Sequence, residues 1–207
     1  KNRKKWYASS LALMAMGTLA LVSAGCSGGG DSYDTPTVVE ASAAATSRLL
    51  SVEDLKAIVD AGKVNGGGYD NVVILHVNSS ATAYNAGHIP GAQFLASGLI
   101  YQTRVEGPSS MTSMVANGPQ MDILLQSLGI DENTTIVLTG ASTMYPARAY
   151  FTLRYWGFAK NCIYMLDGLD TAWTEANYDL ETESPTVAPS TFSVKDNGGL
   201  NDDLRAS

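Results

Sequence analysis

Apolar runs of strand length alternate with helix-like stretches along the middle of the chain. The run at 72–77 is apolar nearly throughout and the run at 136–138 is short and β-branched, which is typical of strands buried on both faces of a sheet. Elsewhere the apolar residues follow helical spacing, as in Leu55 and Ile58 behind Ser51, a predicted N-cap. Strands that alternate with helices predict an α/β domain built on a parallel sheet.

The segment 134–173 contains the clearest unit of this kind. Its strand leads into the polar turn 140–143, and Pro146 stands where a helix takes its first residue, because the missing N–H needs no partner there. The helix is predicted to end just before Gly157, with Phe158 as the apolar contact of a glycine cap.

A second strand is predicted at 162–166, closed by the turn Asp167-Gly168. Strand, helix and strand then form a parallel βαβ unit. The loop at 140–143 would lie at the carboxyl end of one strand and the amino end of a helix. Open α/β sheets place their ligands there, and backbone N–H groups attract anions there.

The amino-terminal stretch, 1–26, has the layout of a secretory signal. An apolar run at 11–22 is followed by small residues up to Cys26 and preceded by four basic residues, Lys1, Arg3, Lys4 and Lys5. The run is too short for a comfortable membrane span.

The boundary Ala24-Gly25-Cys26 resembles the lipobox of bacterial lipoproteins, in which the Cys is acylated and becomes the first residue. Ser23 stands where that family prefers Leu. We therefore expect a periplasmic or cell-envelope lipoprotein anchored at Cys26. Ordinary export with cleavage nearby and an unprocessed membrane anchor are the alternatives.

Net charge restricts the partners of the exported chain. The sequence has 13 Lys and Arg against 20 Asp and Glu, so loss of the four basic residues of the leader leaves 9 against 20 and a formal charge of −11. An acidic surface repels phosphate backbones, which argues against a nucleic-acid partner. Attachment to a membrane is expected only through an acyl chain.

Composition also sets the domain boundaries. Residues 27–47 are rich in Gly, Ser, Ala and Thr and predict a flexible tether. The folded domain is predicted at 48–182, followed by a Pro- and Ser-rich linker or disordered tail at 183–207. We expect residues after about Pro185 to have no partner surface in this chain. The stretch 200–207 has the pattern of a helix that begins a following domain, with a disordered tail as the alternative.

The string Tyr84-Asn85-Ala86-Gly87-His88-Ile89-Pro90-Gly91-Ala92 behind an apolar strand resembles the rhodanese domain. The resemblance extends from about 49 to 181. It implies a rhodanese-like three-layer α/β fold, with a central parallel sheet of about five strands and helices on both faces. The residues that carry this structural motif are Gly87, His88, Pro90, Gly91, Asp167, Gly168 and Trp173.

A lone His88 between Gly87 and Ile89 could be a metal ligand or a base, but the resemblance implies a structural residue of the turn. The sequence has two His and two Cys, and they are too widely scattered to predict a metal site. No cofactor is expected either, because the glycines at 66–68 precede a strand, whereas a phosphate-binding loop follows one.

Rhodaneses move a sulfane sulfur from thiosulfate to an acceptor such as cyanide, through a persulfide on a Cys in the loop after the strand. When the family's strand and loop are aligned with this sequence without a gap, that Cys corresponds to Gly140. Cys162 is predicted to lie in the following strand, as a buried small hydrophobic residue. His76 and Asn78 replace the family's Asp-x-Arg pair at the end of the earlier strand. No catalytic residue is therefore predicted, and the degenerate loop comprises Gly140, Ala141, Ser142, Thr143, Met144 and Tyr145.

The helix after this loop carries Arg148, the aromatic pair Tyr150-Phe151, Arg154, Trp156 and Gly157. This series resembles the non-catalytic amino-terminal domain of two-domain thiosulfate sulfurtransferases. Arg148, Tyr150 and Arg154 are candidates for interdomain or anion contact, whereas Phe151 is predicted to fill the domain's own core. The chain would then be the inactive half of such a protein, with a catalytic rhodanese domain as its partner. The alternative is a free-standing lipoprotein that binds a small anion such as thiosulfate, or a protein, without turnover.

Overall fold

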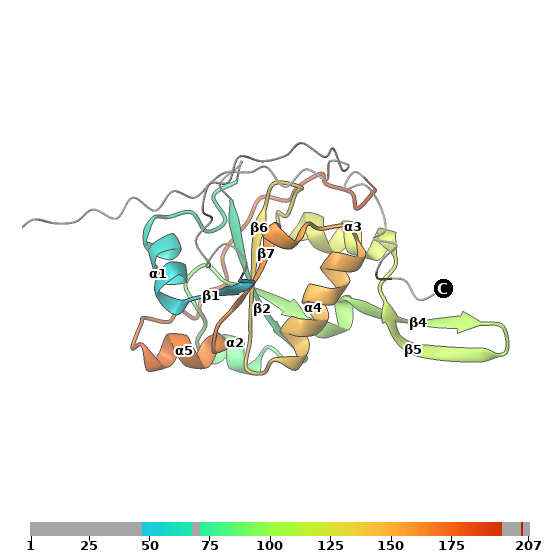
Figure 1. Cartoon of the computed structure of the whole chain (residues 1–207), viewed down its shortest axis with the longest axis horizontal. Coiled ribbons are helices and arrows are strands. Elements are labelled where there is room, and N and C mark those ends of the chain that lie inside the picture. Colours follow the sequence, from blue (N-terminus) through green and yellow to red (C-terminus); the bar gives the residue numbers. More distant parts are fainter. Residues whose placement is uncertain (1–46, 68–70, 196–203, 205–207) are drawn as a thin grey trace, which may run out of the picture.

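A five-stranded parallel sheet forms the centre of the computed structural model, which describes residues 47–67, 71–195 and 204 (Figure 1). The strand order is β1-β7-β6-β2-β3, and every neighbouring pair is parallel. The predicted fold class is confirmed. The strands are β1 (Leu49–Leu50), β2 (Val72–Asn78), β3 (Gln93–Ala96), β6 (Thr135–Thr139) and β7 (Ile163–Leu166).

Helices cover both faces of this sheet. On one face α3 (Gly118–Ser127) and α4 (Met144–Tyr155) share a hydrophobic cluster with the strands, and on the other α1 (Val52–Asp60) and α5 (Leu169–Glu175) share a second cluster. Strand β2 contributes to both, because successive side chains of a strand point to opposite faces. This is why its sequence is a continuous apolar run.

The ends of α4 follow local sequence signals. Gly157 has φ +90° and donates its N–H to Arg154 O, and the N–H of Phe158 reaches Leu153 O, so the predicted glycine cap is confirmed. The predicted start is wrong by two residues, since the helix begins at Met144 and Pro146 is its third residue. The first four N–H groups of a helix lack partners, so Pro is tolerated there too.

Cys162 lies outside the strand in which it was predicted. It ends a short 3-10 helix, η3 (Lys160–Cys162), and β7 begins one residue later. Its side chain is nonetheless fully buried, as predicted.

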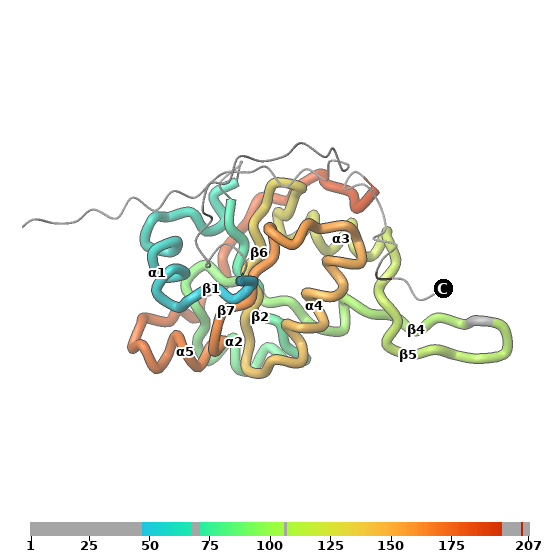
Figure 2. The backbone as a smooth tube through the Cα atoms, in the orientation of Figure 1, coloured from blue at the N-terminus to red at the C-terminus, as the bar shows by residue number. Residues whose placement is uncertain are grey.

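A β-hairpin projects from the domain and was not predicted. Its strands, β4 (Tyr101–Glu106) and β5 (Ser109–Val115), pair antiparallel with each other as a separate two-stranded sheet (Figures 1 and 2). It is inserted after a 3-10 turn, η2 (Ser97–Leu99), that follows β3. A short helix, α2 (Thr82–Ala86), follows β2 at the carboxyl edge of the sheet.

The segment after α5 runs back across the molecule to α3 (Figure 2). Phe192 and Val194 are buried in the cluster beneath α3 and α4. Asp122 and Gln126 of α3 fix the segment through hydrogen bonds to Val194 N (2.8 Å) and Phe192 O (2.7 Å). The expectation that residues after about Pro185 have no partner surface is therefore wrong, because two apolar side chains complete the core.

Several sequence predictions lie outside the described residues. They are the leader and Cys26, nearly all of the tether, and the stretch 200–207 apart from Leu204. Among the residues that are described, no helix has the length and apolar character needed to cross a membrane.

Candidate functional site

The loop after β6, which the sequence analysis predicts to be a degenerate active-site loop, lies at the carboxyl edge of the sheet. Ser142, Thr143 and Met144 are exposed, whereas the side chain of Thr139, the last residue of the strand, is fully buried. Thr139 Oγ1 donates a hydrogen bond to Asp170 Oδ1 at 2.6 Å. The hydroxyl group closest to the end of β6 is therefore already engaged in a hydrogen bond within the domain.

Gly140 is held against the end of β2. A Cβ atom added to it would lie 2.6 Å from the carbonyl oxygen of Val77 and 3.5 Å from Pro146 Cγ. Its φ of +156° is also one that side-chain-bearing residues rarely adopt. The position at which the sequence analysis predicts the family's nucleophile is therefore a glycine, and its backbone leaves no space for a side chain.

A buried polar cluster lies beneath the loop. His76 of β2 is 1% exposed, and its Nδ1 lies 3.1 Å from Asp170 Oδ2, while the other oxygen of Asp170 takes the Thr139 hydroxyl. The ring of His76 packs edge-on against Tyr84, with centroids 5.6 Å apart. These contacts join β2, β6 and α5 directly under the loop.

Sequence reasoning missed Asp170 as a member of this cluster. Asp170 lies in the first turn of α5, immediately after the turn Asp167-Gly168, and its backbone N–H points to Gly140 O at 3.5 Å. The register of the sheet pairs His76 with Thr139, so that both side chains meet α5. The sequence does show an acidic residue three positions after Asp167. Its contact with His76 and Thr139 could be predicted only with knowledge of the register between β2 and β6.

The turn from Gly87 to Gly91 is closed by Glu181. His88 and Glu181 exchange both backbone hydrogen bonds, each 2.9 Å long, and the Glu181 carboxylate accepts from Gly91 N. His88 Nδ1 lies 2.8 Å from Tyr84 O, and its ring stacks on the Tyr84 ring at 3.7 Å. His88 therefore lies inside the turn, 2% exposed, away from any solvent-accessible substrate.

Tyr84 ties this turn to the segment after α5. Its hydroxyl donates to Ala92 O at 2.8 Å and lies 3.1 Å from Ser184 Oγ. Burial raises the pKa of the Tyr84 phenol above its usual value of 10.0, and the nearby Glu181 carboxylate adds to that effect. Within the described ranges, no group of three or more His, Cys, Asp or Glu side chains could hold a metal ion.

The other motif residues shape the fold around this edge. Gly168, with φ +73°, caps the start of α5, and an added Cβ would lie 2.7 Å from that of Ala172. Trp173 is fully buried and donates its indole N–H to Asp179 O at 2.9 Å. Asp167 is exposed, its backbone N–H pairing with Leu50 O, and Pro90 is half-buried in the turn.

The candidate contact residues of α4 are separated by the helix. Tyr150 packs against the core cluster, and Arg154 turns to the end of its own helix, where it donates to Phe158 O. Arg148 donates to Ser113 O of the hairpin at 2.6 Å. Phe151, predicted to fill the core, is 39% exposed instead. The reason is helical rotation: Ala149, Thr152 and Leu153 face the sheet, so residue 151 faces away.

The sheet order, the helices on both faces and the turn at Gly87–Gly91 define a rhodanese-type α/β domain. A sequence model of the rhodanese-like domain matches residues 51–176, more than half of the chain. The protein therefore belongs to the rhodanese-like domain family.

Two curated relatives are similar over a stretch of comparable length. A protein assigned as a thiosulfate sulfurtransferase from Saccharopolyspora erythraea is 27% identical over 128 residues, which cover 61% of this chain and 43% of the relative. The sulfur carrier protein TtuD of Thermus thermophilus is 28% identical over 124 residues, 59% of this chain and 41% of the relative. The chain thus spans less than half the length of these relatives.

Solved structures support the fold. YnjE superposes with a TM-score of 0.57 at 22% identity, covering 70% of this chain and 33% of that one. SseA from Escherichia coli, a 3-mercaptopyruvate sulfotransferase, superposes with a TM-score of 0.55 at 18% identity. The match covers 71% of this chain and 55% of SseA. At these identities the likeness establishes the rhodanese fold.

Proposed function

We propose that this chain is a non-catalytic rhodanese domain, the scaffold half of an exported protein of the thiosulfate:cyanide sulfurtransferase type. Its partner is a catalytic rhodanese domain on the same polypeptide. The observation that carries this proposal is Gly140, whose missing Cβ would lie 2.6 Å from Val77 O.

The chemistry of the neighbouring side chains supports the same conclusion. A persulfide needs a thiolate, and hydroxyl groups such as those of Ser142 and Thr143 cannot hold one. Cys162 is fully buried at the opposite end of β7, which runs from Ile163 toward the loop edge. His76 and Asn78 stand at the end of β2, where the family's Asp-x-Arg pair would stand, and His76 Nδ1 lies 3.1 Å from Asp170 Oδ2.

The two-domain arrangement is supported by the lengths of the relatives. The matched segments cover 43% and 41% of the two curated relatives, so each has further sequence of comparable length. Export and acylation at Cys26 are supported by the basic, apolar and small-residue order of the first 26 residues.

Sulfur transfer by the purified 207-residue chain tests the proposal. Thiocyanate formed from thiosulfate and cyanide should not exceed the uncatalysed rate. Turnover above that rate that is lost in Cys162→Ser would refute the proposal. Saturable thiosulfate binding without turnover would instead favour the free-standing anion-binding lipoprotein.

A further inference from the structure

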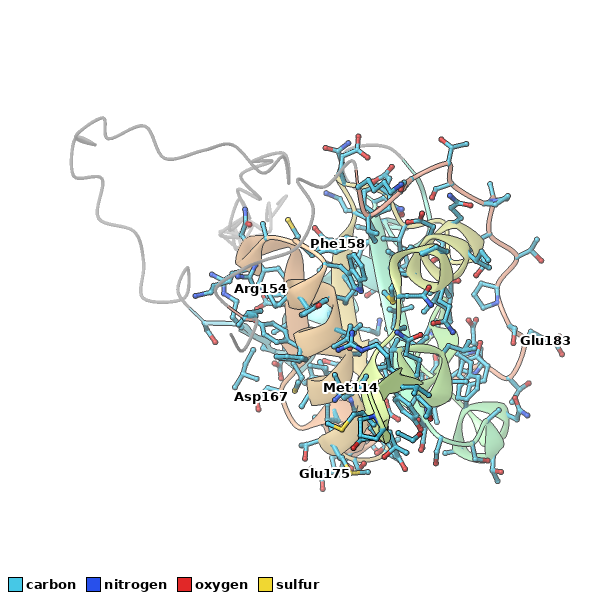
Figure 3. All side chains as sticks on the ribbon, turned by 90° about the vertical axis from the view of Figure 1, so that its right-hand side faces the viewer. Met114, Arg154, Phe158, Asp167, Glu175 and Glu183 are labelled. Atoms are coloured by element: carbon cyan, nitrogen blue, oxygen red, sulfur yellow. The ribbon has the colours of Figure 1, made fainter. Side chains whose placement is uncertain are left out.

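The chain after α5 is held to the domain at two places that differ in chemistry. We name residues 179–194 the return segment. Near its end Phe192 and Val194 are buried in the core, and near its start Glu181 closes the turn that follows α2. Figure 3 shows the segment extended along the outside of the domain, with Glu183 pointing away from it.

His88, inside that turn, has one ring nitrogen whose role is fixed by its partner. Its Nδ1 lies 2.8 Å from Tyr84 O, and a backbone carbonyl only accepts, so Nδ1 carries the hydrogen. In a neutral imidazole the other nitrogen, Nε2, is then an acceptor. Nε2 is buried without a hydrogen-bond partner, and Glu181 Oε1 lies 3.8 Å from it. Without a further proton, two acceptors therefore face each other.

One proton on His88 Nε2 changes the sign of this contact. A protonated imidazole donates from both nitrogens, and a charge-assisted hydrogen bond is stronger than a neutral one. In unstructured peptides an imidazole takes up its second proton at about pH 6.5, and a glutamic acid loses its proton at about pH 4.3. A cationic His88 and an anionic Glu181 can therefore coexist between these limits.

Two titratable side chains face His88, Tyr84 of α2 and Glu181 of the return segment. The Tyr84 ring stacks on the imidazole with ring centroids 3.7 Å apart, and burial raises the pKa of its phenol, which therefore stays neutral throughout this range. Beyond Tyr84 lies a second pair, in which His76 Nδ1 is 3.1 Å from Asp170 Oδ2. Glu181 is thus the carboxylate placed to respond to a proton on His88.

We infer that His88 and Glu181 form a proton-operated clamp on the start of the return segment. Uptake of one proton at His88 Nε2 turns two opposed acceptors into an ion pair. Loss of that proton as the pH rises loosens Glu181 and the residues next to it from the turn. The end of the segment is held by Asp122 and Gln126 of α3, and no imidazole takes part in those hydrogen bonds. The clamp does not depend on the chemistry of the loop at 140–145.

Urea unfolding of the 207-residue chain at about pH 5.5 and about pH 8 tests the clamp. Glu181→Gln keeps a carbonyl acceptor for Gly91 N and removes only the charge. Because the Glu181 side chain is 38% exposed, solvent screens the pair. Between the two pH values the folding equilibrium constant of the parent should fall about threefold more than that of Glu181→Gln. The matched control Glu183→Gln removes an exposed carboxylate of the same segment and should follow the parent.

The ring nitrogens can be observed directly, because the chain has only two His. In ¹⁵N NMR spectra of the imidazoles, assigned with His76→Gln, His88 Nε2 should acquire its hydrogen as the pH falls. It should do so at a higher pH in the parent than in Glu181→Gln.

Amide hydrogen exchange locates the effect along the chain. Relative to unstructured rates, His88 N and Glu181 N, which bond each other's carbonyl oxygens, should be better protected on the acid side of this range. Ser190 N, bonded to Gln126 O near the end of the segment, should keep the same protection.

Three results would overturn the clamp. One is the same pH dependence of unfolding in the parent and in Glu181→Gln. Another is a His88 Nε2 that stays without hydrogen down to about pH 5. The third is an equal loss of pH dependence in Glu183→Gln, which would assign the effect to net charge.

Discussion

Replacing Gly140 by Ala adds one methyl group at the tightest point of the carboxyl edge. The new Cβ would lie 2.6 Å from Val77 O, well inside van der Waals contact. Val77 belongs to β2, is fully buried and pairs with Leu95 of β3, so its carbonyl cannot move without disturbing the sheet. The backbone of Gly140, at φ +156°, would be strained as well.

Two costs determine the size of the effect. Holding a non-glycine residue in a sparsely populated backbone region costs about 1–3 kcal/mol. Overpacking a rigid interior costs a further ~1–3 kcal/mol. Because partial relaxation relieves both together, we expect the free energy of unfolding to fall by roughly 2–5 kcal/mol.

Urea unfolding followed by tryptophan fluorescence measures this loss. Gly98→Ala is the matched control, since Gly98 has no positive φ and an added Cβ meets nothing within 4 Å. The control should stay within about 0.5 kcal/mol of the parent protein. If Gly140→Ala costs no more than the control, the loop opens freely, and the argument that it has no space for a nucleophile is refuted.

Four further predictions follow from the same contacts. Gly140→Cys should form little or no persulfide after thiosulfate treatment, and an abundant sulfur adduct in mass spectrometry would mean that the loop is competent. Glu181→Ala removes the carboxylate that accepts a hydrogen bond from Gly91 N, so the free energy of unfolding measured in urea should fall by about 1–3 kcal/mol. The exposed residue Glu183 provides the control, and a loss no larger than that of Glu183→Ala would mean that Glu181 does not hold the turn. Phe192→Ala should cost about 3–5 kcal/mol because Phe192 is 4% exposed in the core, and an unchanged transition would restore the linker interpretation of the segment. Expressed with its leader in a bacterium, the protein should incorporate labelled palmitate and Cys26→Ala should lose it; equal labelling would remove the lipoprotein proposal.

Short-range signals in the sequence were enough to predict the class of fold and the ends of several helices. The apolar run of β2 indicates a strand covered on both faces, because each face needs its own apolar side chains. Ser51 accepts a hydrogen bond from Asp54 N at the start of α1, and Gly157 ends α4, since caps depend on residues a few positions apart. The absence of a thiol at residue 140 is likewise a property of the sequence alone.

Tertiary structure decided the contacts that join distant parts of the chain. Asp170 meets Thr139 and His76 only because the register of β2 and β6 places those two side chains under α5. Phe192 fills the core under α3, although its surroundings in the sequence are those of a linker, because a loop can return to any apolar gap it can reach. The side of α4 on which Phe151 lies depends on how the helix is rotated against the sheet. The sequence of one helix does not specify that rotation, because its neighbours also compete for the same buried space.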